Sequence, residues 1–247
     1  MRRILFTLCL MLTGTGAWAA AGNYPLDHAP LKLESEAALQ RGAQLFVNYC
    51  QGCHSAQYQR YSRFAEAAGL PEDLVEANLI FTPGTKFTDH MTNAMDREAA
   101  ADWFGAPPPD LTLIARSKGT DYLYTYLRTF YVDESRPYGV NNAVFPLVGM
   151  PHVLWQLQGL QEPVYETTTD EAGHEQQQIT GFELVRKGSM TPEEFDAAMA
   201  DLVTFLAYIG EPIQLERQRI GFWVLLYLVL FFVVAYLLKK EYWKDVH

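Results

Sequence analysis

The sequence predicts an all-α domain of roughly 190 residues, outside the membrane, that is followed by one membrane-spanning helix. Three observations carry this prediction. Apolar residues recur at three- and four-residue spacing over 35–49 and again over 191–209. Residues 220–238 contain no charged side chain. A period-two run of four or more residues, which would indicate a strand, is not found between these segments.

The N-terminus has the pattern of a secretory signal. Arg2 and Arg3 precede an apolar run over 4–12, and small residues around Ala19 supply an A-x-A cleavage site. The apolar run is shorter than a membrane span, which favours a cleaved signal over an uncleaved N-terminal anchor. We therefore expect residues 1–20 to be a signal peptide and the following domain to be exported.

The first predicted helix, over 35–49, leads directly into Cys50-Gln51-Gly52-Cys53-His54. Two thiols in a CxxCH motif can add across the vinyl groups of one porphyrin, and the following histidine then ligates the iron. A thioredoxin-like redox pair would need a βαβ context, and a structural zinc site would need two further ligands at short spacing. The sequence offers neither, so it predicts one covalently attached haem c with Cys50, Cys53 and His54 as its anchors.

Two more helices are predicted. One begins near Gly119 and covers 121–130, and the other begins at Thr191, where the order Thr-Pro-Glu-Glu predicts a capping box, and ends before 210–212. Gly42, followed four residues later by Phe46, would let a second helix cross closely over it. The CxxCH chain resembles single-haem c-type cytochromes, whose N- and C-terminal helices cross in this way. That resemblance implies the 192–209 helix as the partner, with Phe205 or Tyr208 packing on Gly42. Ordinary core packing is an alternative that the sequence leaves open.

Haem iron bound by one histidine needs a sixth ligand, and a methionine thioether raises the reduction potential. The candidates of the mature chain are Met91, Met95, Met150, Met190, Met199, His28, His90, His152 and His174. Met190 and Met199 belong to the packing pattern of the last helix. Prolines on both sides stiffen the loop that presents Met150, which favours this residue, with His152 as the nearest alternative. Physical arguments leave Met91 and Met95 open.

The uncharged stretch 220–238 would span roughly 28 Å as a helix, about the thickness of the bilayer hydrocarbon. A buried globular helix is a poor alternative for 19 uninterrupted uncharged residues. With the export signal, this predicts a periplasmic haem domain at 21–216, an anchor helix at 217–239 and a short cytoplasmic tail at 240–247. The haem domain would then be held at the bacterial inner membrane by a single pass, in contact with membrane lipid.

The chain is acidic, at a formal net charge of −10. Loss of the signal peptide removes two arginines and no acid, so the mature chain is at −12. Between 156 and 185 there are six acids and no lysine or arginine, a run most typical of a solvated loop. A fixed negative field could also steer a basic electron-transfer partner, whereas no nucleic-acid partner is expected.

Several segments, in the same order along the chain, resemble cytochrome c1, the haem-bearing subunit of the bacterial ubiquinol–cytochrome c reductase (cytochrome bc) complex. They are RGAQLFVNYCQGCHS at 41–55, PPPDLTLIARSKGTDYLYTYL at 107–127, NAVFPLVGMP at 142–151 and DLVTFLAYIGEP at 201–212, together with the C-terminal anchor. The resemblance implies thioether bonds to Cys50 and Cys53, axial ligation by His54 and Met150, packing of Pro109 on the haem edge, and propionate contacts from Tyr122 and from Arg116 or Lys118.

The resemblance also implies a function. Electrons would pass from a Rieske iron-sulfur protein through the haem to a soluble or membrane-bound cytochrome c. The chain would be a non-catalytic redox subunit of an enzyme complex, with no catalytic residue of its own. Its partners would be cytochrome b and the Rieske protein in a dimeric assembly. One alternative is a free-standing membrane-anchored cytochrome c that feeds a terminal oxidase. A haem gas sensor or peroxidase-like centre with a displaceable sixth ligand is another.

Overall fold

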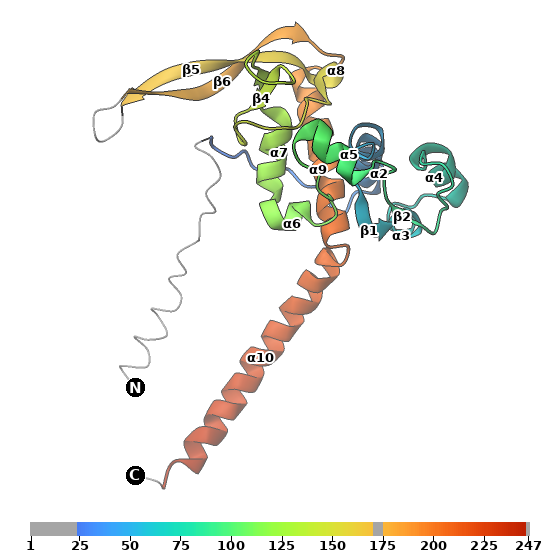
Figure 1. Cartoon of the computed structure of the whole chain (residues 1–247). Coiled ribbons are helices and arrows are strands. Elements are labelled where there is room, and N and C mark those ends of the chain that lie inside the picture. Colours follow the sequence, from blue (N-terminus) through green and yellow to red (C-terminus); the bar gives the residue numbers. More distant parts are fainter. Residues whose placement is uncertain (1–23, 170–174, 246–247) are drawn as a thin grey trace.

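The computed structural model describes residues 24–169 and 175–245, so the expected signal peptide at 1–20 lies outside the described residues. The described chain forms a helical body from which a long two-stranded hairpin projects to one side (Figure 1). A long helix leads away from the opposite part of the body.

The elements follow one another in a simple order. The helices are α2 (Glu36–Leu45), the π-helical turn η1 (Phe46–Cys50), α3 (Tyr61–Ala67), α4 (Glu72–Leu79), α5 (Arg97–Phe104), α6 (Ile114–Lys118), α7 (Thr120–Arg128), α8 (Trp155–Gln158), α9 (Pro192–Gly210) and α10 (Gln214–Tyr242). The strands are β1 (Ala56–Arg60), β2 (His90–Met91), β3 (Phe130–Val132), β4 (Val140–Asn142), β5 (Gly159–Thr169) and β6 (Glu175–Lys187).

The core is built around a close crossing of α2 and α9. An ideal Cβ placed on Gly42 would lie 2.2 Å from the backbone oxygen of Asp201 and 2.7 Å from Cβ of Phe205. The ring of Phe205 packs 5.2 Å from Phe46 and, edge to face, 5.2 Å from Phe64. The predicted crossing over Gly42 is thus confirmed, with Phe205 rather than Tyr208 at the contact, because only a residue without a side chain allows this approach.

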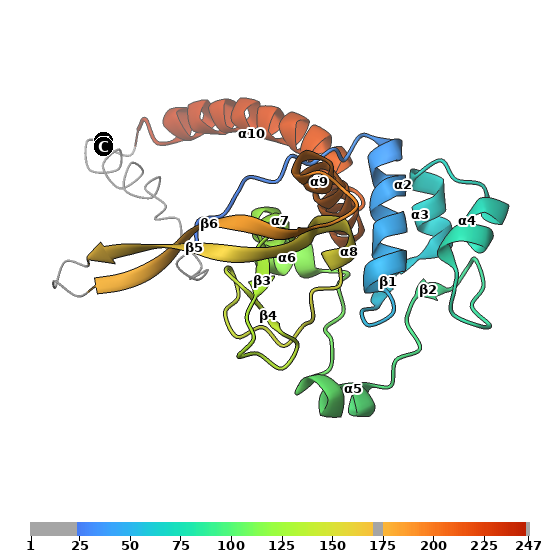
Figure 2. The same ribbon diagram turned by 90° about the horizontal axis from the view of Figure 1, so that it is seen from above.

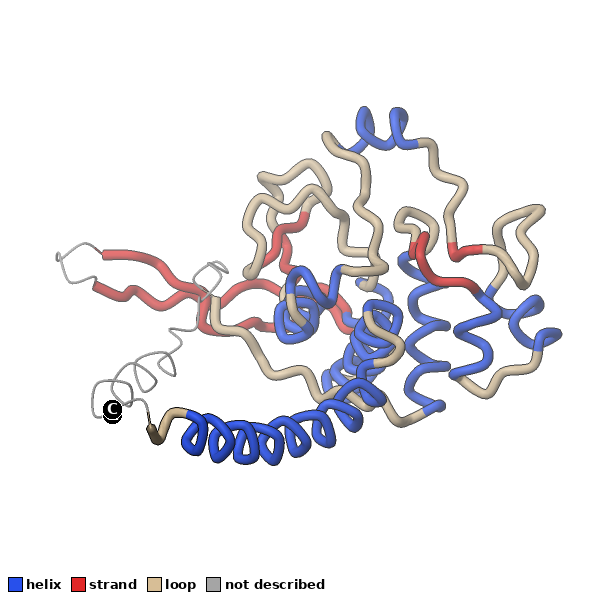
Figure 3. Tube along the Cα trace, turned by 90° about the horizontal axis from the view of Figure 1, so that it is seen from below, coloured by secondary structure: helices blue, strands red, loops and turns tan. Residues whose placement is uncertain are grey.

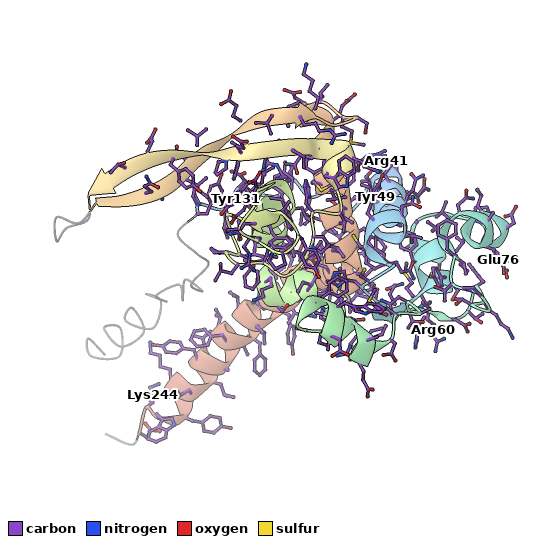
Figure 4. All side chains as sticks on the ribbon, turned by 45° about the horizontal axis from the view of Figure 1, so that its top comes forward. Arg41, Tyr49, Arg60, Glu76, Tyr131 and Lys244 are labelled. Atoms are coloured by element: carbon purple, nitrogen blue, oxygen red, sulfur yellow. The ribbon has the colours of Figure 1, made fainter. Side chains whose placement is uncertain are left out.

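Asp201 itself is buried at this crossing, with 5% of its side chain exposed. Arg41, labelled in Figure 4, donates from Nε to Asp201 Oδ2 at 2.6 Å, and Lys32 Nζ lies 3.6 Å from Oδ1. Both cations are half exposed, so they balance the buried carboxylate while their own charges keep contact with water. The N-terminal segment, α2 and α9 are joined in this way.

The predicted helix ends are largely confirmed. The Ser35 side chain accepts a hydrogen bond from the Ala38 backbone N–H and caps α2. Thr191 and Glu194 form the predicted capping box of α9. The helix expected to cover 121–130 ends earlier, at Arg128, because the chain turns there into β3.

The prediction of an all-α domain is wrong for several segments, since the described residues form three two-stranded antiparallel sheets. The largest pairs β5 with β6, from Gly159 opposite Lys187 to Thr169 opposite Glu175 (Figure 3). The run 156–185 is therefore mostly a hairpin and not the solvated loop that was expected. Most of its side chains are exposed on both faces, so no apolar alternation marks it, and two register shifts interrupt any period of two.

The hairpin is attached to the body at its base and extends away from it (Figure 2). Tyr131 of β3, labelled in Figure 4, packs its ring 6.3 Å from that of Phe182. The side-chain amide of Gln161 donates to the backbone oxygens of Arg128 and Phe130, at 3.0 and 2.8 Å. These contacts fix the base of the hairpin on the end of α7.

The C-terminal helix α10 has the properties of a membrane anchor. It has a mean hydropathy of 2.6 in its most apolar window and buries none of its residues against the rest of the described chain. Only residues 211–213 separate it from α9, and Glu211 at this connection forms an ion pair with Arg217. The predicted span 217–239 lies within this helix.

Candidate haem-binding site

The CxxCH motif begins at a local widening of the first helix. Phe46–Cys50 is a π-helical turn, and the Gln51 N–H donates to the Phe46 oxygen at 2.9 Å. Such turns occur frequently at functional sites. The backbone N–H groups of Cys53 and His54 then both donate to the Cys50 oxygen, at 3.1 and 2.9 Å, so the chain closes one tight turn. The turn brings both thiols and the imidazole to the same end of α2.

The two thiols are unpaired and differ in exposure. Cys50 is buried and Cys53 is partly exposed. Burial raises the pKa of Cys50 to about 12 and also raises that of Cys53. Reactive redox cysteines need a lowered pKa, so these thiols do not suit the redox-pair alternative. Within the described ranges no group of three or more His, Cys, Asp and Glu could hold a metal ion.

One hydrogen bond fixes the orientation of His54. Its Nδ1 donates to the backbone oxygen of Pro109 at 2.7 Å, which leaves Nε2 as the ring atom available for iron. Desolvation lowers the pKa of His54, although the Pro109 bond and the charge of Asp110 oppose this, and the neutral imidazole is the form that binds metal.

The segment that carries Pro109 is itself tied to the haem motif. The Leu111 N–H donates to the Ser55 oxygen at 2.8 Å, and Asp110 Oδ2 accepts from the Gln57 N–H at 2.8 Å. The resemblance implied that Pro109 packs on the haem edge. The structure shows a further role for this residue, because its backbone oxygen sets the direction of the histidine.

Met150 lies in a loop that side-chain hydrogen bonds hold in shape. Asn142 Oδ1 accepts from the backbone N–H groups of Val144 and Phe145, at 3.0 and 3.1 Å. Asn141 Oδ1 accepts from the N–H of Leu147 at 2.8 Å. The predicted stiffness of this loop thus comes from these two asparagines as well as from its prolines.

Leu147 adopts a left-handed backbone conformation with φ of +62°, which is uncommon for a residue other than glycine. Arg136 supports the residue by donating from its guanidinium to the Leu147 oxygen at 2.9 Å. A conformation of this kind persists where the surroundings determine it, as is frequent beside ligand sites. The sequence analysis did not identify these supports, although the Asn-Asn pair is a turn signal that could have indicated the two asparagines.

The Met150 side chain is partly buried against a small cluster of Phe130, Val140 and Val148. The Tyr126 hydroxyl lies 3.4 Å from its Sδ and donates to it. The sequence alone does not distinguish Tyr126 from the other residues of the helix predicted over 121–130.

The structure gives most of the other candidate ligands different roles. Met91 and Met199 are fully buried in the main core, and Met190 packs against that core. His152 is buried, with its ring stacked 5.0 Å from that of Phe130 and burial lowering its pKa to about 4. His28 pairs with Asp121, His90 is exposed and Met95 is partly exposed, whereas His174 lies outside the described residues. These positions favour Met150 as the sixth ligand.

Of the residues expected to contact the haem propionates, the structure brings Tyr122 and Lys118 together and places Arg116 elsewhere. The Tyr122 ring stacks on that of Tyr126 with centroids 6.1 Å apart, and Lys118 Nζ lies 5.8 Å from the Tyr122 centroid. Arg116 instead lies against the end of α9, where its Cγ would be 3.4 Å from a Cβ on Gly210. Lys118 is therefore better placed than Arg116 to act together with Tyr122.

Together these residues fit a c-type haem. Two thiols in one turn, an imidazole whose Nε2 is left free and a thioether on a stiff loop are the groups that covalent attachment and six-coordinate iron require.

Comparisons with known proteins identify the family to which the chain is similar. The model of the Cytochrome C1 family matches residues 28–246. The chain is 50% identical to a protein named cytochrome c1 from Allochromatium vinosum, over the whole length of both chains. It is 45% identical to a protein named ammonia monooxygenase gamma subunit from Nitrosomonas europaea, again over both whole chains. A cytochrome c1 from Rhodospirillum rubrum is 28% identical over 84% of this chain and 81% of its own.

Proposed function

This chain belongs to the cytochrome c1 family, and from that membership we propose that His54 and Met150 are the axial ligands of a haem c attached through Cys50 and Cys53. The chain is a haem-containing electron-transfer subunit of the bc1 complex and carries one covalently bound haem c. The observation that carries the ligand assignment is the His54–Pro109 hydrogen bond, because it leaves one ring nitrogen free beside both thiols.

The residues of this chain hold the site rather than break bonds. Bound haem c supplies an iron that alternates between Fe(III) and Fe(II). Pro109 fixes the imidazole of His54, and the loop held by Asn141 and Asn142 fixes the thioether of Met150. A site whose ligands are held in this way changes little when an electron arrives or leaves, which suits rapid transfer.

Membership of the bc1 complex implies cytochrome b and the Rieske iron-sulfur protein as partners. The relay then runs from the Rieske protein through this haem to a soluble or membrane-bound cytochrome c, in a dimeric complex. Tyr122 and Lys118 contact the haem propionates in this proposal, because the structure places them together.

The protein is anchored in the membrane, and α10 is its candidate span. We place the haem domain of residues 21–216 in the periplasm, the anchor at 217–239 in contact with membrane lipid, and the tail 240–247 in the cytoplasm. The signal-like N-terminus supports this orientation. Protease added to intact spheroplasts should remove the haem domain and leave a tag at the C-terminus protected; cleavage of the tag alone would reverse the orientation.

The ligand assignment is tested by Met150→Leu with Met95→Leu as the matched control. Pyridine haemochrome analysis should find one c-type haem in both variants, because the thioether attachment is untouched. The midpoint potential should fall sharply only in Met150→Leu, since a thioether ligand favours Fe(II). An unchanged potential and visible spectrum in Met150→Leu would assign the sixth ligand elsewhere.

Purification in mild detergent tests the assembly. Co-elution of this chain with b-type haem and a [2Fe-2S] protein is expected of the complex. A c-type haem protein that elutes alone from native membranes under conditions that preserve the complex would favour the free-standing carrier instead.

A further inference from the structure

The phenol of Tyr126 makes a contact that haem attachment does not require. Its hydroxyl donates to Met150 Sδ at 3.4 Å, a distance that suits a hydrogen bond to the large sulfur atom. The residue lies on α7, which belongs neither to the CxxCH segment nor to the methionine loop. A phenol carries its proton at neutral pH, so this hydroxyl is a hydrogen-bond donor.

The surroundings leave the Tyr126 ring little freedom. It stacks on the Tyr122 ring, with an interplanar angle of 9°, and meets the Phe130 ring edge to face at 5.2 Å. Its backbone oxygen accepts from Asn142 Nδ2 at 2.8 Å. The same asparagine uses its Oδ1 to hold the methionine loop, so the hydroxyl and the sulfur that it meets are fixed by one network.

We propose that Tyr126 is a positioning residue, which directs the Met150 thioether and raises the reduction potential of the site. This inference rests on the proposed ligation of iron by Met150. A thioether sulfur has two lone pairs, of which one can bind iron while the other accepts the phenol proton. The hydrogen bond withdraws electron density from sulfur, which weakens its donation to the metal and favours Fe(II) over Fe(III).

The dipole of the Tyr126 hydroxyl raises the reduction potential as well, in the same direction as the withdrawal of electron density from sulfur. The hydroxyl directs the positive end of its dipole toward the sulfur that would bind iron. A positive dipole end in a partly buried site disfavours the form with the larger positive charge. Both effects therefore raise the potential, and removal of one hydroxyl should lower it.

Tyr126→Phe in the full-length holoprotein tests the inference, with Tyr124→Phe as the matched control. Both replacements delete one hydroxyl from a tyrosine of α7, but Tyr124 packs under the Arg128 guanidinium instead of against Met150. The Fe(III)/Fe(II) equilibrium of Tyr126→Phe should shift about three- to tenfold toward Fe(III), or roughly 30–60 mV. The midpoint potential of Tyr124→Phe should change by less than about a third of this shift.

A second readout concerns the restraint on the sulfur. Added imidazole should displace the thioether of oxidised Tyr126→Phe faster than that of the control, because the side chain has lost its second attachment. A Tyr126→Phe potential and displacement rate equal to those of Tyr124→Phe would overturn the inference. If Met150→Leu leaves the axial coordination unchanged, then the proposed ligation itself has failed, and the two failures are distinguished.

The wild-type protein supplies a measurement that does not depend on any variant folding. In the reduced holoprotein, proton NMR should show a slowly exchanging hydroxyl proton of Tyr126 with a nuclear Overhauser effect to the Met150 methyl group. A Tyr126 hydroxyl that exchanges freely with solvent and lacks this effect would equally overturn the inference.

Discussion

Replacement of Gly42 by alanine should destabilise the haem domain through one contact. The added methyl carbon would lie 2.2 Å from the Asp201 oxygen and 2.7 Å from Cβ of Phe205, whereas ordinary contact begins at 3.4 Å. The two helices must therefore separate by about 1.2 Å at their crossing or bend to the same extent. The atoms in the way belong to the backbone and to a Cβ, so no side chain can rotate aside.

The free-energy change can be estimated from two opposing effects. Alanine gains about 1 kcal/mol over glycine inside a helix. Overpacking of a core costs about 1–3 kcal/mol, and the upper end applies here because the obstructing atoms cannot rotate away. The net loss should be about 2 kcal/mol, which lowers the unfolding midpoint by roughly 4–8 °C for a domain of this size.

Thermal unfolding of the detergent-solubilised holoprotein, followed by circular dichroism, measures this loss. Gly221→Ala is the control, because its added methyl would meet nothing within 4 Å and α10 would gain only helix propensity. If Gly42→Ala unfolds at the same temperature as the wild type or above it, then α2 and α9 do not approach as closely as described, and the reasoning is wrong.

Three further predictions concern the parts of the fold that support the site. Thr191→Ala removes the capping box of α9 and should cost about 1 kcal/mol in urea unfolding; no change would mean that the cap is not formed in solution. Arg128→Lys loses the two-pronged contact with Asp196, at 2.5 and 2.8 Å, and should cost about 1–2 kcal/mol in the same assay, whereas a stable variant would show that the pair contributes nothing. Burial raises the pKa of Tyr61, which is 0% exposed, so the folded state keeps a proton that the unfolded chain releases near pH 10. Stability should thus be complete below pH 10 and fall above it, and Tyr61→Phe should flatten that fall in urea titrations at pH 9 and pH 11; parallel losses in the two proteins would contradict this assignment.

The helical part of the fold could be predicted because its signals are local. Capping at Thr191 and the apolar spacing of α9 depend only on neighbouring residues. The glycine at 42 permits a close crossing, but its partner helix was expected from the resemblance to single-haem c-type cytochromes. The β5–β6 hairpin could not be found in the same way. Its strands are exposed on both faces, and the backbone pairing that stabilises it leaves no periodic apolar pattern.

The residues of the candidate site also differ in whether local sequence signals identify them. The CxxCH motif and the proline-flanked Met150 could be recognised in the sequence, because their chemistry lies in adjacent residues. The Pro109 oxygen and the Tyr126 hydroxyl could not, since a backbone acceptor 55 residues away and a donor 24 residues away become neighbours only in the folded chain. The choice of Lys118 over Arg116 likewise depends on the helix face from which each side chain projects in the folded chain.

The short connection between α9 and α10 limits how this subunit can take part in a relay. Three residues leave too little slack for the domain to swing on its anchor, and the Glu211–Arg217 ion pair stiffens them further. The distance of the haem domain from the membrane surface then depends on the tilt of the single helix α10. In the proposed relay, a haem domain held in this way would receive and release electrons at one place, so its redox partners would have to move to it.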